Sequence, residues 1–244
     1  MPFAYPRTRS LNPIGKPCKI SGVLASGLSK RQASIHLTIR AVGEQVVPPV
    51  LILRGLGRAV DPTEFAHYLG LENIKGYYQP KAWCDTHFFQ WYLTEVFNPA
   101  VRETGELRDQ LLCLDNLTAH DRSSSIELMK ELGIQPFYLA AHCTDVAAPV
   151  DHHVGALLKL KIRELYEANL EVPGQFDLWR GEGDIHSDLS TAHRRCLMAT
   201  WLNGAWASMK HMQSFFLSAF TSTGCLMKKN GRNLVKMRGL PGLG

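Results

Sequence analysis

Two aspartates of this 244-residue sequence, Asp115 and Asp151, are placed so that their carboxylates could converge. Asp115 directly follows the apolar run LLCL (111–114), and Asp151 opens the segment VDHHVGALLKLKIRELYEANLE (150–171). Carboxylate oxygens are preferred ligands of Mg²⁺ and Mn²⁺, and such sites keep positions open for water and for substrate phosphates. The pair is therefore a candidate site for a divalent cation.

A purely structural role for both aspartates stays open at this point. Aspartate is among the favoured N-cap residues of helices, because its side chain accepts a hydrogen bond from a free backbone N–H. Asp115 could cap the segment that follows it, and Asp151 could cap the helix that it opens.

The elements expected between the two aspartates would return the chain to the same edge of a sheet. The run 111–114 predicts a central strand buried on both faces. A helix is expected over 121–133, ending at Gly133, then a strand over 134–140 and a long helix over 150–171. Because α/β sheets place binding sites at the carboxyl ends of their strands, Asp115 falls at such a position.

Upstream, the sequence predicts two further strands and a helix. SIHLTIRAV (34–42) alternates apolar and polar residues, and VVPPVLILRG (46–55) follows a short polar turn, which favours an antiparallel hairpin. The aromatic-rich stretch 83–101 predicts an amphipathic helix that Asp85 or Thr86 caps and that Pro99 helps to end. Residues 56–79 give weak signals of loop and short helix, and KISGV (19–23) is strand-like.

Composition and charge exclude several classes of protein. No run of about 18 apolar residues offers a membrane span, and the start of the sequence lacks the apolar stretch of a secretory signal. The six cysteines show no paired spacing, so we expect reduced, mostly buried thiols and an intracellular protein.

Charge is distributed unevenly along the chain. Residues 1–43 carry +7 and residues 227–244 carry +5, and since the whole chain carries +5, the middle is acidic at −7. Basic ends suggest a polyanion partner and the acidic middle a cation, although solvated surface charges would give the same pattern.

The order of these segments resembles the DDE superfamily endonuclease domain of pogo, Tigger and jerky type transposases. The likeness is carried by LLCLDN with His120, by FYLAAHCTDVAAPVD leading to Asp151, by SGLSKRQASIHLTIRAVGEQVVPPVLILRGLGR, by PKAWCDTHFFQW and by WLNGAWASM. It covers most of residues 3–225. The resemblance implies an α/β fold, with a ribonuclease-H-like mixed sheet flanked by helices and a C-terminal helical extension.

The resemblance also implies a chemistry and a set of residues. Asp115 and Asp151 would be the second and third acidic residues, which hold Mg²⁺ or Mn²⁺ for phosphoryl transfer on DNA. Contacts to DNA phosphates are expected from Lys30, Arg31, Lys159 and Lys161. His120 would either help to place a phosphate or make a structural hydrogen bond. A nuclear protein is expected, and a dimer is one compatible oligomeric state.

Departures from the family pattern predict an incomplete site. The first acidic residue of the family lies on the first strand, but the earliest acidic residue here is Glu44. Ala148 stands where the family usually has a glutamine, and Ala140-Ala141 where it has a proline-rich stretch. We therefore expect the first strand to be missing or incomplete and the chain alone to have little or no strand-transfer activity.

Two rival interpretations remain. One is a domesticated DNA-binding protein that has lost catalysis. The other is a zinc site, for which the sequence offers Cys84, His87, His142, Cys143, His152 and His153 in spacings that match no known finger.

Four segments are expected along the chain. They are a basic, loop-rich lead-in (1–31), the partial endonuclease core (32–171), a linker with a helical extension (172–226) and a basic tail (227–244).

Overall fold

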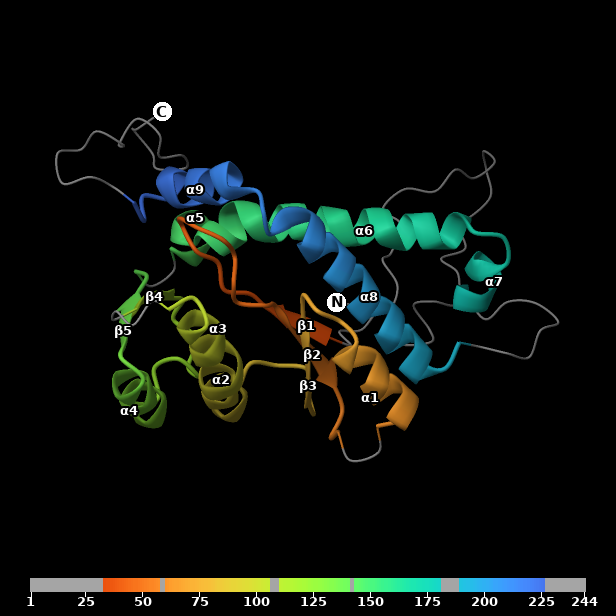
Figure 1. Cartoon of the computed structure of the whole chain (residues 1–244), viewed down its shortest axis with the longest axis horizontal. Helices are drawn as coiled ribbons and strands as arrows, with labels where there is room; N and C mark the ends of the chain where they lie inside the picture. The colour runs from red at the N-terminus through yellow and green to blue at the C-terminus, as the bar shows by residue number, and fades with distance from the viewer. Residues whose placement is uncertain (1–32, 58–59, 106–109, 141–142, 181–188, 227–244) are drawn as a thin grey trace, which may run out of the picture.

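The computed structural model describes residues 33–57, 60–105, 110–140, 143–180 and 189–226. These residues form helices and small sheets, so the predicted α/β class is confirmed at that level (Figure 1). The strand-like stretch 19–23, the lead-in and the basic tail lie outside the described residues. Within the described residues, no helix has the length and apolar character needed to cross a membrane.

Three strands form the first sheet, in the order β1-β2-β3. β1 (Ala33–His36) pairs antiparallel with β2 (Val50–Arg54), which confirms the predicted hairpin. Both strands are shorter than expected. β2 begins after Pro48 and Pro49, which have no N–H to donate to a neighbouring strand. β3 (Lys75–Gln79), which the sequence did not predict, pairs parallel with β2.

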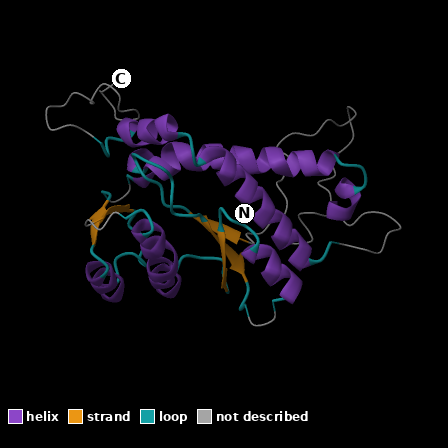
Figure 2. Ribbon diagram, in the orientation of Figure 1, coloured by secondary structure: helices purple, strands orange, loops and turns teal. Residues whose placement is uncertain are grey.

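The second sheet consists of β4 (Gln110–Leu114) and β5 (Ile134–Tyr138), which run parallel and are joined through α4 (Ser123–Glu131). A single mixed sheet was expected, but the described strands form two sheets, which Figure 2 shows as separate groups of arrows. The prediction that β4 is buried on both faces is also wrong. Leu112 and Leu114 are buried, whereas Leu111, which points to the other face, is 69% exposed.

The aromatic-rich helix is confirmed, with an irregular middle. It comprises α2 (Thr86–Tyr92), the π-helical turn η1 (Leu93–Phe97) and α3 (Asn98–Arg102). Asp85 is its N-cap, since a carboxylate oxygen accepts from the Phe88 N–H at 2.8 Å. Pro99 does not end the helix, because the backbone stays helical from the π-helical turn η1 through Pro99 to Arg102.

Helices make up the remaining elements. α1 (Pro62–Leu69) connects β2 to β3 along the chain. The predicted helix over 150–171 is confirmed as η2 (Val150–Val154) and α6 (Gly155–Glu171), which the short α5 (Thr144–Ala147) precedes. α7 (Gln175–Arg180), α8 (Thr191–Met209) and α9 (Gln213–Ser222) follow. These three helices lie within the segment 172–226, for which the sequence predicted a linker with a helical extension.

Two hydrophobic cores lie on opposite faces of β2. Leu51 and Leu53 belong to the core that α6, α8 and α9 cover, and this core also contains Trp201 and Trp206. Val50 and Ile52 alternate with them and face the second core, which α2, η1, β4 and α4 build. Figure 1 shows α6 and α8 on one side of the three-stranded sheet and α2 on the other.

A buried ion pair fastens α8 to α1. The Arg195 guanidinium donates to both carboxylate oxygens of Glu64, with N–O distances of 2.6 and 2.7 Å. The hydroxyls of Tyr68 and Tyr78 donate to the same carboxylate. Burial acts to raise the pKa of Glu64, but the hydrogen bonds from Arg195 and the tyrosines outweigh it and hold the pKa below its ordinary value.

Candidate metal and nucleic-acid site

Asp115 lies where the sequence predicted, at the carboxyl end of β4. Its Oδ1 is 2.7 Å from Nδ1 of His120, and it also accepts from the Leu117 N–H at 3.4 Å. The hydrogen bond from His120 outweighs partial burial and lowers the pKa of Asp115 below its ordinary value. Because the side chain is 42% exposed, the carboxylate is charged at neutral pH and still open to solvent.

His120 is itself held in place from several sides. Its side chain is buried and packs against the ring of Phe89, with 4.4 Å between the ring centroids. The Tyr138 hydroxyl of β5 donates to the His120 carbonyl oxygen at 2.9 Å. Donation from Nδ1 to Asp115 assigns the proton to that nitrogen. Nε2 is buried and finds no hydrogen-bond partner within the described ranges.

Asn116 joins the ends of the two strands beside the candidate ligand. Its side-chain amide donates to the carbonyl oxygen of Leu139 at 2.7 Å, just past the end of β5. The residues LDN at the end of β4 thus have distinct tasks, since Leu114 packs in the core, Asp115 faces solvent and Asn116 fixes the loop.

Asp151 lies in the first turn of η2, at the start of the long helix. The residue as a whole is exposed at the surface. Partial burial of the carboxyl group, followed by the negative charge of Asp115, raises the pKa of Asp151, whereas the positive charge of Lys159 acts to lower it. Asp115 and Asp151 also line the same cleft. Their mutual repulsion is what a bound cation would relieve.

A cleft of about 690 Å³ brings these groups together. One wall is the segment that starts in β1 and continues to Val42, and the other is β4 with the loop that carries Asp115 and His120. The link into η2, including Asp151, closes one end. The cleft therefore separates the edge of the first sheet from the edge of the second.

His36 is a further member of the cleft that sequence reasoning did not select. Its ring packs against Tyr92 at 4.3 Å and lies 6.4 Å from the His120 ring, measured between centroids. Burial, followed by the proximity of His120, lowers the pKa of His36 to about 3. The alternation of residues 34–42 placed His36 on the polar face of the strand, and nothing in that pattern distinguished it from Thr38 or Arg40.

The structure describes two of the four basic residues that were expected to contact DNA. Lys30 and Arg31 lie outside the described residues. Lys159 is exposed on α6, and its charge reaches Asp151. Lys161 makes an ion pair with Glu164, with 3.0 Å between Nζ and Oε2.

The side chains present suit a divalent cation in part. Asp115 uses one oxygen for His120 and keeps the other, and Asp151 adds a second carboxylate with a raised pKa. However, the part of the chain that is described contains no group of three or more His, Cys, Asp or Glu side chains that could hold a metal ion. The described members of the zinc set give no such group either, while His142 lies outside the described residues.

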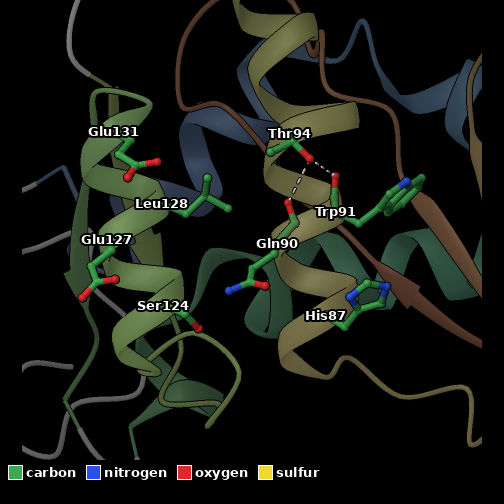
Figure 3. A pocket seen from close by; sticks show the side chains of 8 residues that line it. All are labelled: His87, Gln90, Trp91, Thr94, Ser124, Glu127, Leu128 and Glu131. Carbon is green, nitrogen blue, oxygen red and sulfur yellow. Dashed lines mark hydrogen bonds between the residues drawn. The ribbon is translucent and has the colours of Figure 1, made fainter.

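A second, shallower pocket of about 400 Å³ lies between α2 and α4. Figure 3 shows its lining, which is His87, Gln90, Trp91, Thr94, Ser124, Glu127, Leu128 and Glu131. The Thr94 hydroxyl donates to the carbonyl oxygens of Gln90 and Trp91, at the point where α2 passes into the π-helical turn. Neither candidate ligand takes part in this pocket.

Small sheets flanked by helices, with one carboxylate at a strand end and another at a helix start, are compatible with a nuclease-like fold. A family model described as DDE superfamily endonuclease matches residues 30–173, which is more than half of the chain. The chain therefore belongs to the DDE superfamily endonuclease family. No curated protein and no solved structure matches it.

Proposed function

We propose that the chain carries a transposase-type DNA endonuclease core, spanning residues 32–171, whose Asp115 and Asp151 hold a divalent cation. One observation carries the proposal. Two carboxylates from different elements line one cleft, and burial together with the charge of Asp115 raises the pKa of Asp151. Mg²⁺ or Mn²⁺, when bound, would neutralise charge on a DNA phosphate during in-line attack.

The residues of the chain have separate tasks in this proposal. Asp115 supplies its free oxygen to the cation, while His120 holds the other oxygen and so fixes the orientation of the carboxylate. Asn116 keeps the loop in place through Leu139. Lys159, with Lys30, Arg31 and Lys161, supplies contacts to DNA phosphates that do not depend on sequence.

The order of the elements favours one particular fold for this core. A ribonuclease-H-like arrangement is supported by an antiparallel hairpin, a parallel β4–β5 pair and a helix that begins with the second carboxylate. We extend the proposal to the pogo, Tigger and jerky type, to a nuclear location and to a helical extension over 172–226, all of which rest on the resemblance in sequence.

Cleavage by this chain alone is expected to be weak. Among the described residues, the acidic side chains lining the cleft are Asp115 and Asp151, one carboxylate fewer than the family uses. Two carboxylates would bind the cation loosely and leave the attacking group poorly placed.

Isothermal titration of Mg²⁺ into the full chain tests the metal site. We expect binding heat for the unaltered protein and its loss in Asp115→Asn and in Asp151→Asn. Glu127→Gln is the matched control, because Glu127 is an acidic residue of the separate α2–α4 pocket. Equal heats in all four proteins would refute the site.

A DNA-binding protein without catalysis is the second candidate, and the two-carboxylate cleft favours it over a fully active enzyme. Gel-shift measurements over a range of salt separate the cases. Binding that weakens with salt and ignores Mg²⁺ supports the second candidate. Strong Mg²⁺-dependent nicking of plasmid DNA, lost in Asp115→Asn, would instead establish an active enzyme. Failure to bind DNA at low salt would count against both.

A further inference from the structure

Cys113 and Cys225 lie next to each other although they are far apart in the sequence. Cys113 belongs to β4, and Cys225 lies in the turn that follows α9. The two thiols share a hydrogen bond. The Cys225 thiol also donates to the carbonyl oxygen of Ala147, which is 3.3 Å from Sγ. The pair thus joins β4, α5 and the end of α9.

Both sulfurs are placed where a small molecule can reach them. Each cysteine is a free thiol, partly rather than fully buried, and both line the cleft. The sequence had predicted mostly buried thiols, so this exposure is a correction. Among the described cysteines, no other two are recorded in contact with each other.

The electrostatic setting differs between this pair and the other thiols. The hydrogen bond from Cys113 lowers the pKa of Cys225 below its ordinary value. Burial, in contrast, raises the pKa values of Cys84 and Cys196. Because the thiolate is the reactive form, Cys225 is expected to react first with an oxidant.

We propose that Cys113 and Cys225 form a site of reversible thiol oxidation, at which a peroxide converts the two thiols into a disulfide that fastens the end of α9 to β4. The disulfide would cross the wall of the cleft beside the candidate metal ligands. This inference does not depend on the proposed endonuclease function.

The reaction is balanced with hydrogen peroxide as the oxidant. The sulfur of Cys225 attacks one peroxide oxygen, so that an S–O bond forms, the O–O bond breaks and one water leaves. The sulfur of Cys113 then attacks the resulting sulfenic acid, so that the S–S bond forms, the S–O bond breaks and a second water leaves. In total, the two thiols lose two protons and two electrons, and the peroxide takes up both to become two molecules of water.

The approach that the reaction needs is small. A disulfide requires about 2.05 Å between the sulfurs, so the two thiols, which share a hydrogen bond, must move closer together to reach bonding distance. Cys225 lies in a turn rather than inside a helix, and it can move without breaking a helical hydrogen-bond ladder. β4 can therefore stay in place.

Peptide mapping of the full chain after treatment with equimolar hydrogen peroxide tests the proposal. Free thiols are blocked by alkylation, and the protein is digested without reductant. We expect one linked pair of peptides containing Cys113 and Cys225, which dithiothreitol separates. The oxidised protein should also melt several degrees higher than the reduced one, because the disulfide closes a long loop of the unfolded chain.

Variants keep the test decisive. Cys113→Ser and Cys225→Ser should each abolish the linked peptides and the rise in melting temperature, whereas Cys196→Ser should keep both. Circular dichroism checks that each variant is folded, and Cys225→Ala serves as a second replacement. Linkage of Cys113 to another cysteine such as Cys18, or oxidation spread evenly over all cysteines, would overturn the proposal.

Discussion

Removing the charge of Arg195 should destabilise the protein strongly, because it would leave the carboxylate of Glu64 buried without a cation. The Glu64 side chain is 1% exposed and receives two hydrogen bonds from the guanidinium. Breaking a buried ion pair by removing one partner costs about 3–5 kcal/mol. We therefore expect Arg195→Met to lower the free energy of unfolding by about that amount at pH 7.

The double variant Glu64→Met with Arg195→Met should lose less than Arg195→Met alone, since it buries no unpaired charge. The hydroxyls of Tyr68 and Tyr78 would lose their acceptor, but they lie 3.5 Å apart and can bond to each other. Urea unfolding followed by tryptophan fluorescence measures all these values. Arg163→Met, which removes an exposed pair with Glu167, is the control and should change nothing measurable.

The dependence on pH gives a second test of the same ion pair. In the unaltered protein the folded pKa of Glu64 is depressed, so its stabilisation is present above the unfolded pKa of about 4.3 and is lost as the pH falls through the folded value. In Arg195→Met, burial is left to raise this pKa, and protonation on acidification relieves the penalty. The deficit should therefore shrink from pH 7 towards pH 4. A deficit below about 1 kcal/mol at pH 7, or one that ignores pH, would refute the reasoning.

Three further outcomes are expected. Asp115→Asn should lower the pKa of Asp151, because a like charge is removed, and NMR titration of the carboxyl carbon measures it; an unchanged pKa would mean that the two carboxylates do not interact. Trp206→Ala should cost about 3–5 kcal/mol in urea unfolding, whereas the same change at Trp83, which is 47% exposed, should cost far less. His36 should show no titration between pH 5 and 8 by NMR. Because its folded pKa of about 3 lies below the unfolded value, protonation of the unfolded chain should lower the free energy of unfolding as the pH falls below about 6.5. An NMR pKa near 6.5 would contradict the burial of His36.

Features coded by neighbouring residues were predictable from the sequence. The cap at Asp85 follows from an aspartate three residues before a helical N–H. The end of α4 follows from Gly133, whose φ of +72° is a conformation that glycine adopts without strain. The position of Asp115 after β4 follows from a short apolar run that stops at a charge.

Features that depend on distant partners were not predictable. β3 has the sequence KGYYQ, which shows no clear alternation of apolar and polar residues. It becomes a strand because the chain returns after α1 to the side of β2 and pairs with it. The division into two sheets likewise depends on which edges meet in space. His36 entered the candidate site only because Tyr92 and His120 come to it from other elements. The roles of Asp115 and Asp151 as metal ligands stay predictions.

One hydrophobic core is shared by β1, β2, α6, α8 and α9, and it determines when the chain can finish folding during synthesis. The family match ends at residue 173, whereas Trp206 and Phe216 cover Leu51 and Leu53 from beyond that point. A polypeptide ending there would leave the apolar sides of β2 and α6 open to water, and exposed surfaces of this kind favour aggregation. On the ribosome, this face of the sheet stays uncovered until α9 has emerged, so this core cannot be completed before Ser222 has been synthesised.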